Sequence, residues 1–186
     1  MSLKEMLDFN KNFVENKHYT AYETNSLPNK KMVVLTCMES RLVELLPRAL
    51  NIQNGDVKML KNAGAVLRRP FDNMTKSILI AVHNLQAESV LIIGHYDCGM
   101  SKVNTDELIQ HMIEKGISKE TIDLLEKSGI NFEEEFEGFQ TVEDSIRQGV
   151  NILREHPLLP DYVKVHGLVM DPSTGQVHTV TTEDES

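Results

Sequence analysis

Two short apolar runs, each ending abruptly in reactive side chains, constrain this chain more than any other feature. Met32–Thr36 is rich in β-branched and aliphatic residues and is followed at once by Cys37. Ser89–Gly94 has the same character and is followed by His95 and, three residues later, Cys98. Runs of this kind predict buried strands, and ligands of open α/β sheets bind beyond the carboxyl ends of such strands. We therefore expect a functional site where the two runs end.

The rest of the chain alternates between strand and helix patterns. Further strands are predicted at Val57–Leu60, Val163–Met170 and Gln176–Val180. Between the strands, apolar residues recur at spacings of three and four, as amphipathic helices require. The acidic segment 129–138 is expected to be an irregular, solvated loop. This alternation, closed by a turn at 171–175, predicts an α/β fold with a central, mostly parallel β-sheet flanked by helices and ending in one hairpin.

Length and charge exclude several classes of protein. The 186 residues suffice for one domain over residues 1–186, and no repeat or linker divides them. Lys and Arg total 19 against 28 Asp and Glu, and the net charge of −9 argues against nucleic acid or an anionic membrane as a partner. No apolar run approaches the roughly 20 residues of a membrane span, and the first residues lack the apolar core of a secretory signal. We therefore expect a cytoplasmic protein.

The N-terminal segment predicts a helix with an unusual position. Ser2-Leu3-Lys4-Glu5 has the pattern of a capping box, which opens a helix. An apolar stripe follows at helical spacing: Leu3, Met6, Leu7, Phe13 and Val14. Little sequence precedes this helix for it to pack on. Residues 1–25 therefore form an arm that lies either across the domain or on a partner subunit.

Two cysteines and one histidine make a candidate metal centre. If the two strands are parallel neighbours, Cys37, His95 and Cys98 converge at one point. Two thiolates and an imidazole are a good zinc ligand set with a fourth position left over. In a reducing compartment such cysteines are more typical of ligands or catalysts than of a disulfide. A Cys37–Cys98 redox pair, which needs no histidine, is the alternative.

Three motifs resemble the β-class carbonic anhydrases over nearly the whole chain: Cys37-Met38-Glu39-Ser40-Arg41, Asn62-Ala63-Gly64 and Gly94-His95-Tyr96-Asp97-Cys98-Gly99. Glu39 departs from the family pattern, which has Asp at this position. The resemblance implies a sheet of four parallel strands plus one antiparallel edge strand. It also implies one zinc per chain on the three ligands above, and an N-terminal arm that wraps around the other half of a homodimer or higher homo-oligomer.

The same resemblance implies an activity, the reversible hydration of carbon dioxide to bicarbonate and a proton by zinc-bound hydroxide. Glu39, held by Arg41, is then expected to orient the hydroxide as a catalytic pair. Ser40 is expected to cap the following helix. The residues expected to line the substrate pocket are Asn62, Ala63, Gly64 and Gly99. Asn62 fits equally well as a turn residue with a local hydrogen bond.

Several alternatives stay open at this point. The same site could hydrolyse carbon disulfide or carbonyl sulfide, or the chain could be a zinc-binding protein with little turnover, a reading supported by Glu39 alone. Glu39 itself could pair with Arg41 and leave the fourth metal position open, or extend onto the metal and close it. The other six histidines are expected to have surface or core roles: His18, His83, His111, His156, His166 and His178.

Overall fold

A five-stranded sheet forms the centre of the protein. The computed structural model describes residues 1–182, so the last four residues of the predicted domain lie outside the described part. The strands run in the spatial order β2-β1-β3-β4-β5. Their bounds are β1 (Met32–Cys37), β2 (Val57–Asn62), β3 (Ser89–His95), β4 (Lys164–Met170) and β5 (Val177–Thr181). The first four are mutually parallel, and β5 pairs antiparallel with β4 at the edge, which confirms the predicted fold.

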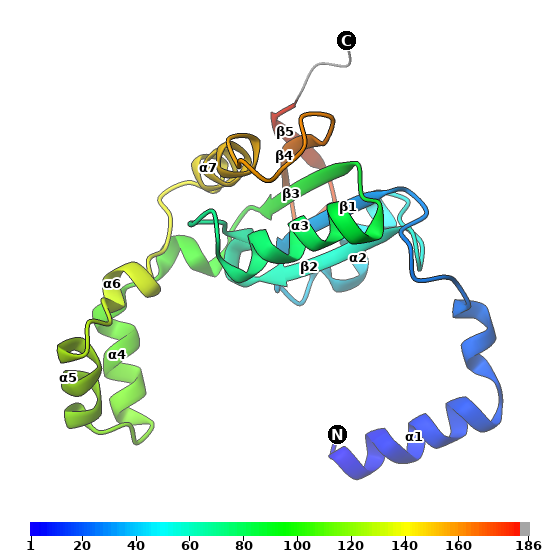
Figure 1. Ribbon diagram of the computed structural model, residues 1–186. Coiled ribbons are helices and arrows are strands. Elements are labelled where there is room, and N and C mark those ends of the chain that lie inside the picture. Colours follow the sequence, from blue (N-terminus) through cyan, green and yellow to red (C-terminus); the bar gives the residue numbers. More distant parts are fainter. Residues whose placement is uncertain (183–186) are drawn as a thin grey trace.

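Helices cover both faces of this sheet (Figure 1). On one face, α3 (Asn73–Leu85) and α7 (Val142–Arg154) bury their apolar stripes against β1, β3 and β4. On the other, α2 (Leu42–Ala49) packs Leu42 and Leu46 against the sheet. A Cβ atom at Gly94 would lie 2.5 Å from Val142 Cγ2, so only glycine lets α7 pack this close to the end of β3. This contact fixes the position of β3 relative to α7 just before His95.

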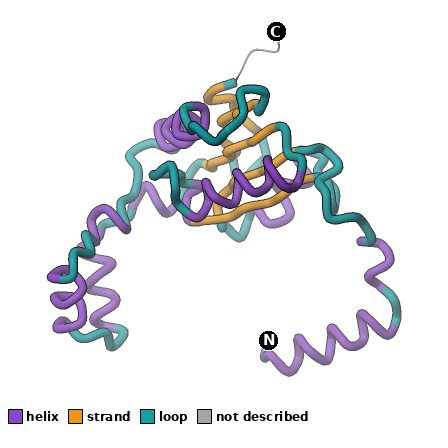
Figure 2. Tube along the Cα trace, viewed as in Figure 1, coloured by secondary structure: helices purple, strands orange, loops and turns teal. Residues whose placement is uncertain are grey.

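Two helical segments project from this body (Figures 1 and 2). One holds α4 (Thr105–Glu114), α5 (Lys119–Lys127) and the short α6 (Phe132–Glu135). The expectation that segment 129–138 is irregular is wrong for residues 132–135 and holds for the others. The Asn131 side chain caps α6 by accepting from the Glu133 and Glu134 N–H groups. This capping lets a helical turn form inside an otherwise polar segment.

The other projection is the N-terminal arm, which holds α1 (Leu3–Glu15) and the 3-10 helix η1 (His18–Tyr22). The predicted capping box is present at Ser2 and Glu5. No residue of α1 is buried, and Leu3 and Phe9 are 71% and 70% exposed. The apolar stripe of this helix is therefore uncovered in the single chain. None of the helices in residues 1–182 combines the length and apolarity needed to cross a membrane.

Candidate metal centre

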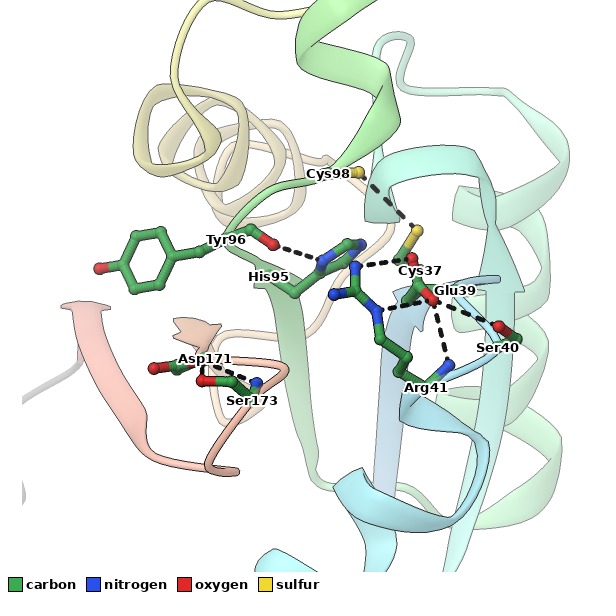
Figure 3. Close-up of polar contacts among 9 residues, drawn as sticks. All are labelled: Cys37, Glu39, Ser40, Arg41, His95, Tyr96, Cys98, Asp171 and Ser173. Atoms are coloured by element: carbon green, nitrogen blue, oxygen red, sulfur yellow. Dashed lines mark hydrogen bonds and ion pairs between the residues drawn. The ribbon is translucent and has the colours of Figure 1, made fainter.

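The sheet topology brings the three predicted ligands together. β1 and β3 are parallel neighbours in register, with Thr36 opposite Ile93, so both strands end at the same edge. Cys37 and His95 close these strands, and Cys98 follows three residues later. The two sulfur atoms are 3.9 Å apart, and the ligand atoms of all three buried residues lie within 4.8 Å of one another (Figure 3). The predicted convergence is therefore present.

The imidazole of His95 is oriented as a metal ligand. Its Nδ1 lies 2.8 Å from the carbonyl oxygen of Tyr96, which accepts a hydrogen bond from Nδ1–H and so leaves Nε2 as the ring nitrogen with a free lone pair. Nε2 is buried and is the one such side-chain atom in residues 1–182 without a hydrogen-bond partner. A buried polar atom without a partner is costly unless something else binds it. The donor set of two sulfurs and this nitrogen fits zinc.

The two thiols differ in their protonation. A hydrogen bond from Cys98, helped by the Gly64 N–H at 3.3 Å, outweighs burial and lowers the pKa of Cys37 to about 4. The neighbouring Cys37 sulfur and burial raise the pKa of Cys98. Burial lowers the pKa of His95, but the Cys37 sulfur and the Tyr96 carbonyl outweigh it, so that the pKa is raised. Without a metal the two sulfurs therefore share one proton, which a cation would displace.

Glu39 and Arg41 form a bidentate ion pair beside the ligands (Figure 3). Arg41 Nε lies 3.1 Å from Glu39 Oε1 and Nη2 lies 3.2 Å from Oε2, while the Arg41 backbone N–H donates to Oε1 at 3.1 Å. The Arg41 guanidinium lowers the pKa of Glu39 to about 2, so the carboxylate is ionised at neutral pH. Among the described residues the metal-ligating cluster includes no carboxylate. Glu39 thus points its charge at Arg41.

The remaining predicted site residues surround this centre in different ways. Asn62 clamps its own loop, with Nδ2 donating to the Val66 carbonyl at 2.7 Å and Oδ1 accepting from the Val66 N–H at 3.0 Å. Asn62 and Ala63 also line a cavity of about 370 Å³ under the α4–α6 projection. Gly64 contacts the Cys37 sulfur directly. Gly99 lies at an exposed position, where a Cβ atom would meet no other atom within 4 Å.

The expectation that Ser40 caps α2 is wrong. The cap position is Arg41, whose backbone is already helical, and no side chain caps the helix there. The Ser40 hydroxyl instead donates to Glu39 Oε1 at 3.3 Å. Ser40 therefore lies one residue before the cap position, and its hydroxyl serves as a donor to the Glu39 carboxylate.

Two groups at this site could not be predicted from the sequence because they belong to the main chain. The Gly64 N–H contacts a ligand sulfur, and the Tyr96 carbonyl holds the ligand imidazole. A main-chain donor or acceptor carries no side-chain signal, so only its position next to a motif could have indicated it. Of the other histidines, His156 is buried with both ring nitrogens in hydrogen bonds, and His178 lies against the ring of Tyr96.

Comparisons with known proteins agree on one family. Residues 32–177 match the family model described as "Carbonic anhydrase". The chain is 46% identical over 178 residues to "Putative carbonic anhydrase YtiB" of Bacillus subtilis, covering 96% of this chain and 95% of that protein. It is 28% identical over 187 residues to "Carbon disulfide hydrolase" of Acidithiobacillus thiooxidans, covering 95% and 90%. Its structure resembles that of β-carbonic anhydrase isoform I from Trichomonas vaginalis, with a TM-score of 0.86, 27% identity and coverage of 98% and 99%.

Proposed function

This chain belongs to the β-carbonic anhydrase family, and we propose that it is a zinc-dependent carbonic anhydrase that reversibly converts carbon dioxide and water to bicarbonate and a proton. One observation carries the proposal. The buried Nε2 of His95 has no partner among the described residues and faces two sulfur atoms that are 3.9 Å apart. This is the donor set of a three-ligand zinc site with an open fourth position.

One zinc per chain would be held by Cys37 Sγ, His95 Nε2 and Cys98 Sγ. When bound, zinc supplies a Lewis acid that lowers the pKa of a coordinated water and so provides a nucleophile for carbon dioxide. The chain's own residues position the ligands. The Gly64 N–H bonds the Cys37 sulfur and the Tyr96 carbonyl fixes the His95 ring, so the three donor atoms are preorganised by main-chain contacts.

Glu39 and Arg41 orient the attacking water. A carboxylate held on both oxygens by one guanidinium has little freedom to rotate. Its remaining lone pairs can accept a hydrogen bond from the water and so aim the oxygen lone pair at the substrate carbon. Because Arg41 keeps the Glu39 carboxylate ionised, it acts as an acceptor throughout the neutral range. We take this arrangement as the open form of the site, in which the longer acid leaves the fourth position to water.

The substrate pocket would be formed by Asn62, Ala63, Gly64 and Gly99, which border the centre from the ends of two strands. We also propose that α1 packs on a second subunit, because its apolar stripe is uncovered in the single chain. The protein would then be a homodimer or a higher oligomer. The two unpaired thiols at the site suit a reducing compartment, which is consistent with a cytoplasmic location.

A stopped-flow assay of carbon dioxide hydration across pH, on protein with measured zinc content, tests the proposal. We expect turnover that rises above neutrality, because two thiolates donate charge to the metal and make the bound water a weaker acid. Cys98→Ser should lose zinc and turnover together, since zinc prefers thiolate. Full zinc content with no hydration activity would contradict the proposed reaction and favour the zinc-binding protein with little turnover.

A second candidate rests on the similarity to carbon disulfide hydrolase. Carbon disulfide is linear like carbon dioxide and would meet the same centre. Incubating the zinc-loaded protein with carbon disulfide and measuring sulfide release, beside the hydration assay, decides between the two substrates. Sulfide release without carbon dioxide hydration would replace the first candidate by the second.

A further inference from the structure

The loop that carries two of the three ligands contains a strained residue. Asp97 lies between His95 and Cys98 and adopts a left-handed backbone with φ of 53°. Aspartate adopts this conformation more readily than most residues with a Cβ atom, but it still costs energy relative to the ordinary backbone regions. The Asp97 carboxylate accepts from Lys102 Nζ at 3.1 Å, but this pair is exposed on both sides and holds the loop weakly. Another contact must therefore hold the loop in place.

Both main-chain groups of Tyr96 help to keep the loop in place. Its N–H donates to the carbonyl oxygen of Met170 at 3.0 Å, at the end of β4. Its own carbonyl accepts from Nδ1 of His95 at 2.8 Å. The direction of the His95 ring is thus coupled to the position of the Tyr96 backbone, which in turn is coupled to β4.

The side chain of Tyr96 extends away from the ligands toward other elements (Figure 3). Its ring centroid lies 5.8 Å from that of His178 on β5, with the rings tilted by 58°. One residue therefore joins the ligand loop to β4 by its main chain and to β5 by its side chain.

We propose that Tyr96 is a positioning residue of the metal centre, whose side chain holds the ligand loop against β5 and so aims Nε2 of His95 at the metal. The residue touches neither the metal position nor the substrate. It acts through His95, because a shift of its backbone would rotate the imidazole. The inference rests on the proposed zinc site but concerns the affinity and geometry of that site rather than its reaction.

Zinc affinity of the full-length protein, measured by competition with a chromophoric chelator, tests this role. Groups that hydrogen-bond a metal ligand typically contribute about 10- to 100-fold in metal affinity. We expect Tyr96→Ala to bind zinc about tenfold more weakly, because the carbonyl partner of His95 is kept but loosened. Tyr96→Phe keeps the ring against His178 and should stay within about twofold of the parent. Tyr162→Ala, an exposed tyrosine outside the ligand loop, is the matched control and should bind zinc like the parent.

Cobalt substitution adds a readout that a merely structural role would not move. The visible absorption of Co²⁺ reports ligand geometry, and it should change in Tyr96→Ala and stay unchanged in Tyr96→Phe and Tyr162→Ala. If Tyr96→Ala fails to fold, His178→Ala removes the same ring contact from an exposed edge strand and should weaken zinc binding about threefold. The inference would be overturned if the folded Tyr96→Ala variant had the zinc affinity and cobalt spectrum of the parent. If Tyr96→Ala does not fold, the same result for His178→Ala would overturn it. A parent protein that binds no zinc would instead refute the proposed function.

Discussion

Replacing Gly64 by alanine tests the geometry around the Cys37 sulfur most directly. Gly64 adopts φ of 78°, a left-handed conformation that costs a residue with a Cβ atom about 1 kcal/mol. The added Cβ would lie 2.9 Å from Met100 Cγ and 3.0 Å from Phe139 Cε1. Overpacking of this kind typically lowers the free energy of unfolding by about 1–3 kcal/mol. Because the Met100 side chain is flexible it can move aside at low cost, so most of the energetic cost comes from the contact with the less flexible Phe139 ring.

Together these effects predict that Gly64→Ala lowers the free energy of unfolding by about 2–4 kcal/mol. For a chain of this length each kilocalorie shifts the melting temperature by about 2–4 °C, so we expect a decrease of roughly 4–16 °C in calorimetry. Zinc affinity should fall as well, because the strained residue carries the N–H that donates to the Cys37 sulfur.

Gly99→Ala is the matched control for stability. Gly99 also lies beside the site, but its φ is not positive and an added Cβ meets no atom within 4 Å. Its melting temperature should equal that of the parent or exceed it slightly, since alanine reduces the entropy of the unfolded chain. Equal melting temperatures for Gly64→Ala and Gly99→Ala would refute both the strain and the clash assigned to Gly64.

Three further measurements follow from the site and the arm. Zinc affinity should rise at least about tenfold per pH unit between pH 6 and 8, because Cys98 has a raised pKa and must lose its proton to bind, and the raised pKa of His95 adds to the rise in the lower part of this range. A pH-independent affinity would contradict this. At matched zinc occupancy, Glu39→Asp should hydrate carbon dioxide at least as fast as the parent. Glu39→Gln should be slower, because it loses the charge that holds Arg41. A much slower Glu39→Asp would mean that the pocket is fitted to the longer acid. Light scattering should show a dimer or larger oligomer that Met6→Glu weakens and the control Asn12→Glu, on the opposite face of α1, does not. A monomeric parent would refute the role of the arm.

The sheet could be predicted from the sequence because its signals are local. Each predicted strand differs from the observed one by no more than two residues at either end, since apolar runs such as Ser89–Gly94 are bounded by residues that strands disfavour. Helix α1 was similarly marked by its capping box at Ser2. The one-turn helix α6 was missed because its signal is a single side chain, Asn131, within a run of like charges that argues against helix.

The ion pair at the site shows where residue identity predicts contacts and where it misleads. Glu39 pairs with Arg41, as in the first of the two alternatives drawn from the sequence. The side chain of Arg41 is 46% exposed, so the pairing follows from the matched geometry of carboxylate and guanidinium rather than from the cost of a buried charge. The role of Ser40 was predicted from helix propensity alone. The helix begins one residue later than expected, with Arg41 at the cap position, so Ser40 lies outside the cap and its hydroxyl donates to the Glu39 carboxylate.

Main-chain contacts to the ligands differ in whether they constrain the sequence at all. The Gly64 N–H reaches the Cys37 sulfur only from a left-handed backbone, so this contact favours glycine and leaves a visible motif residue. The Tyr96 carbonyl could be supplied by any residue, so its contact with His95 leaves no trace of its own. What the sequence records at this position is the side chain that keeps the carbonyl in place. A bulky aromatic residue between two ligands should therefore be examined for contacts that point away from the metal, because those contacts fix the ligand that precedes it.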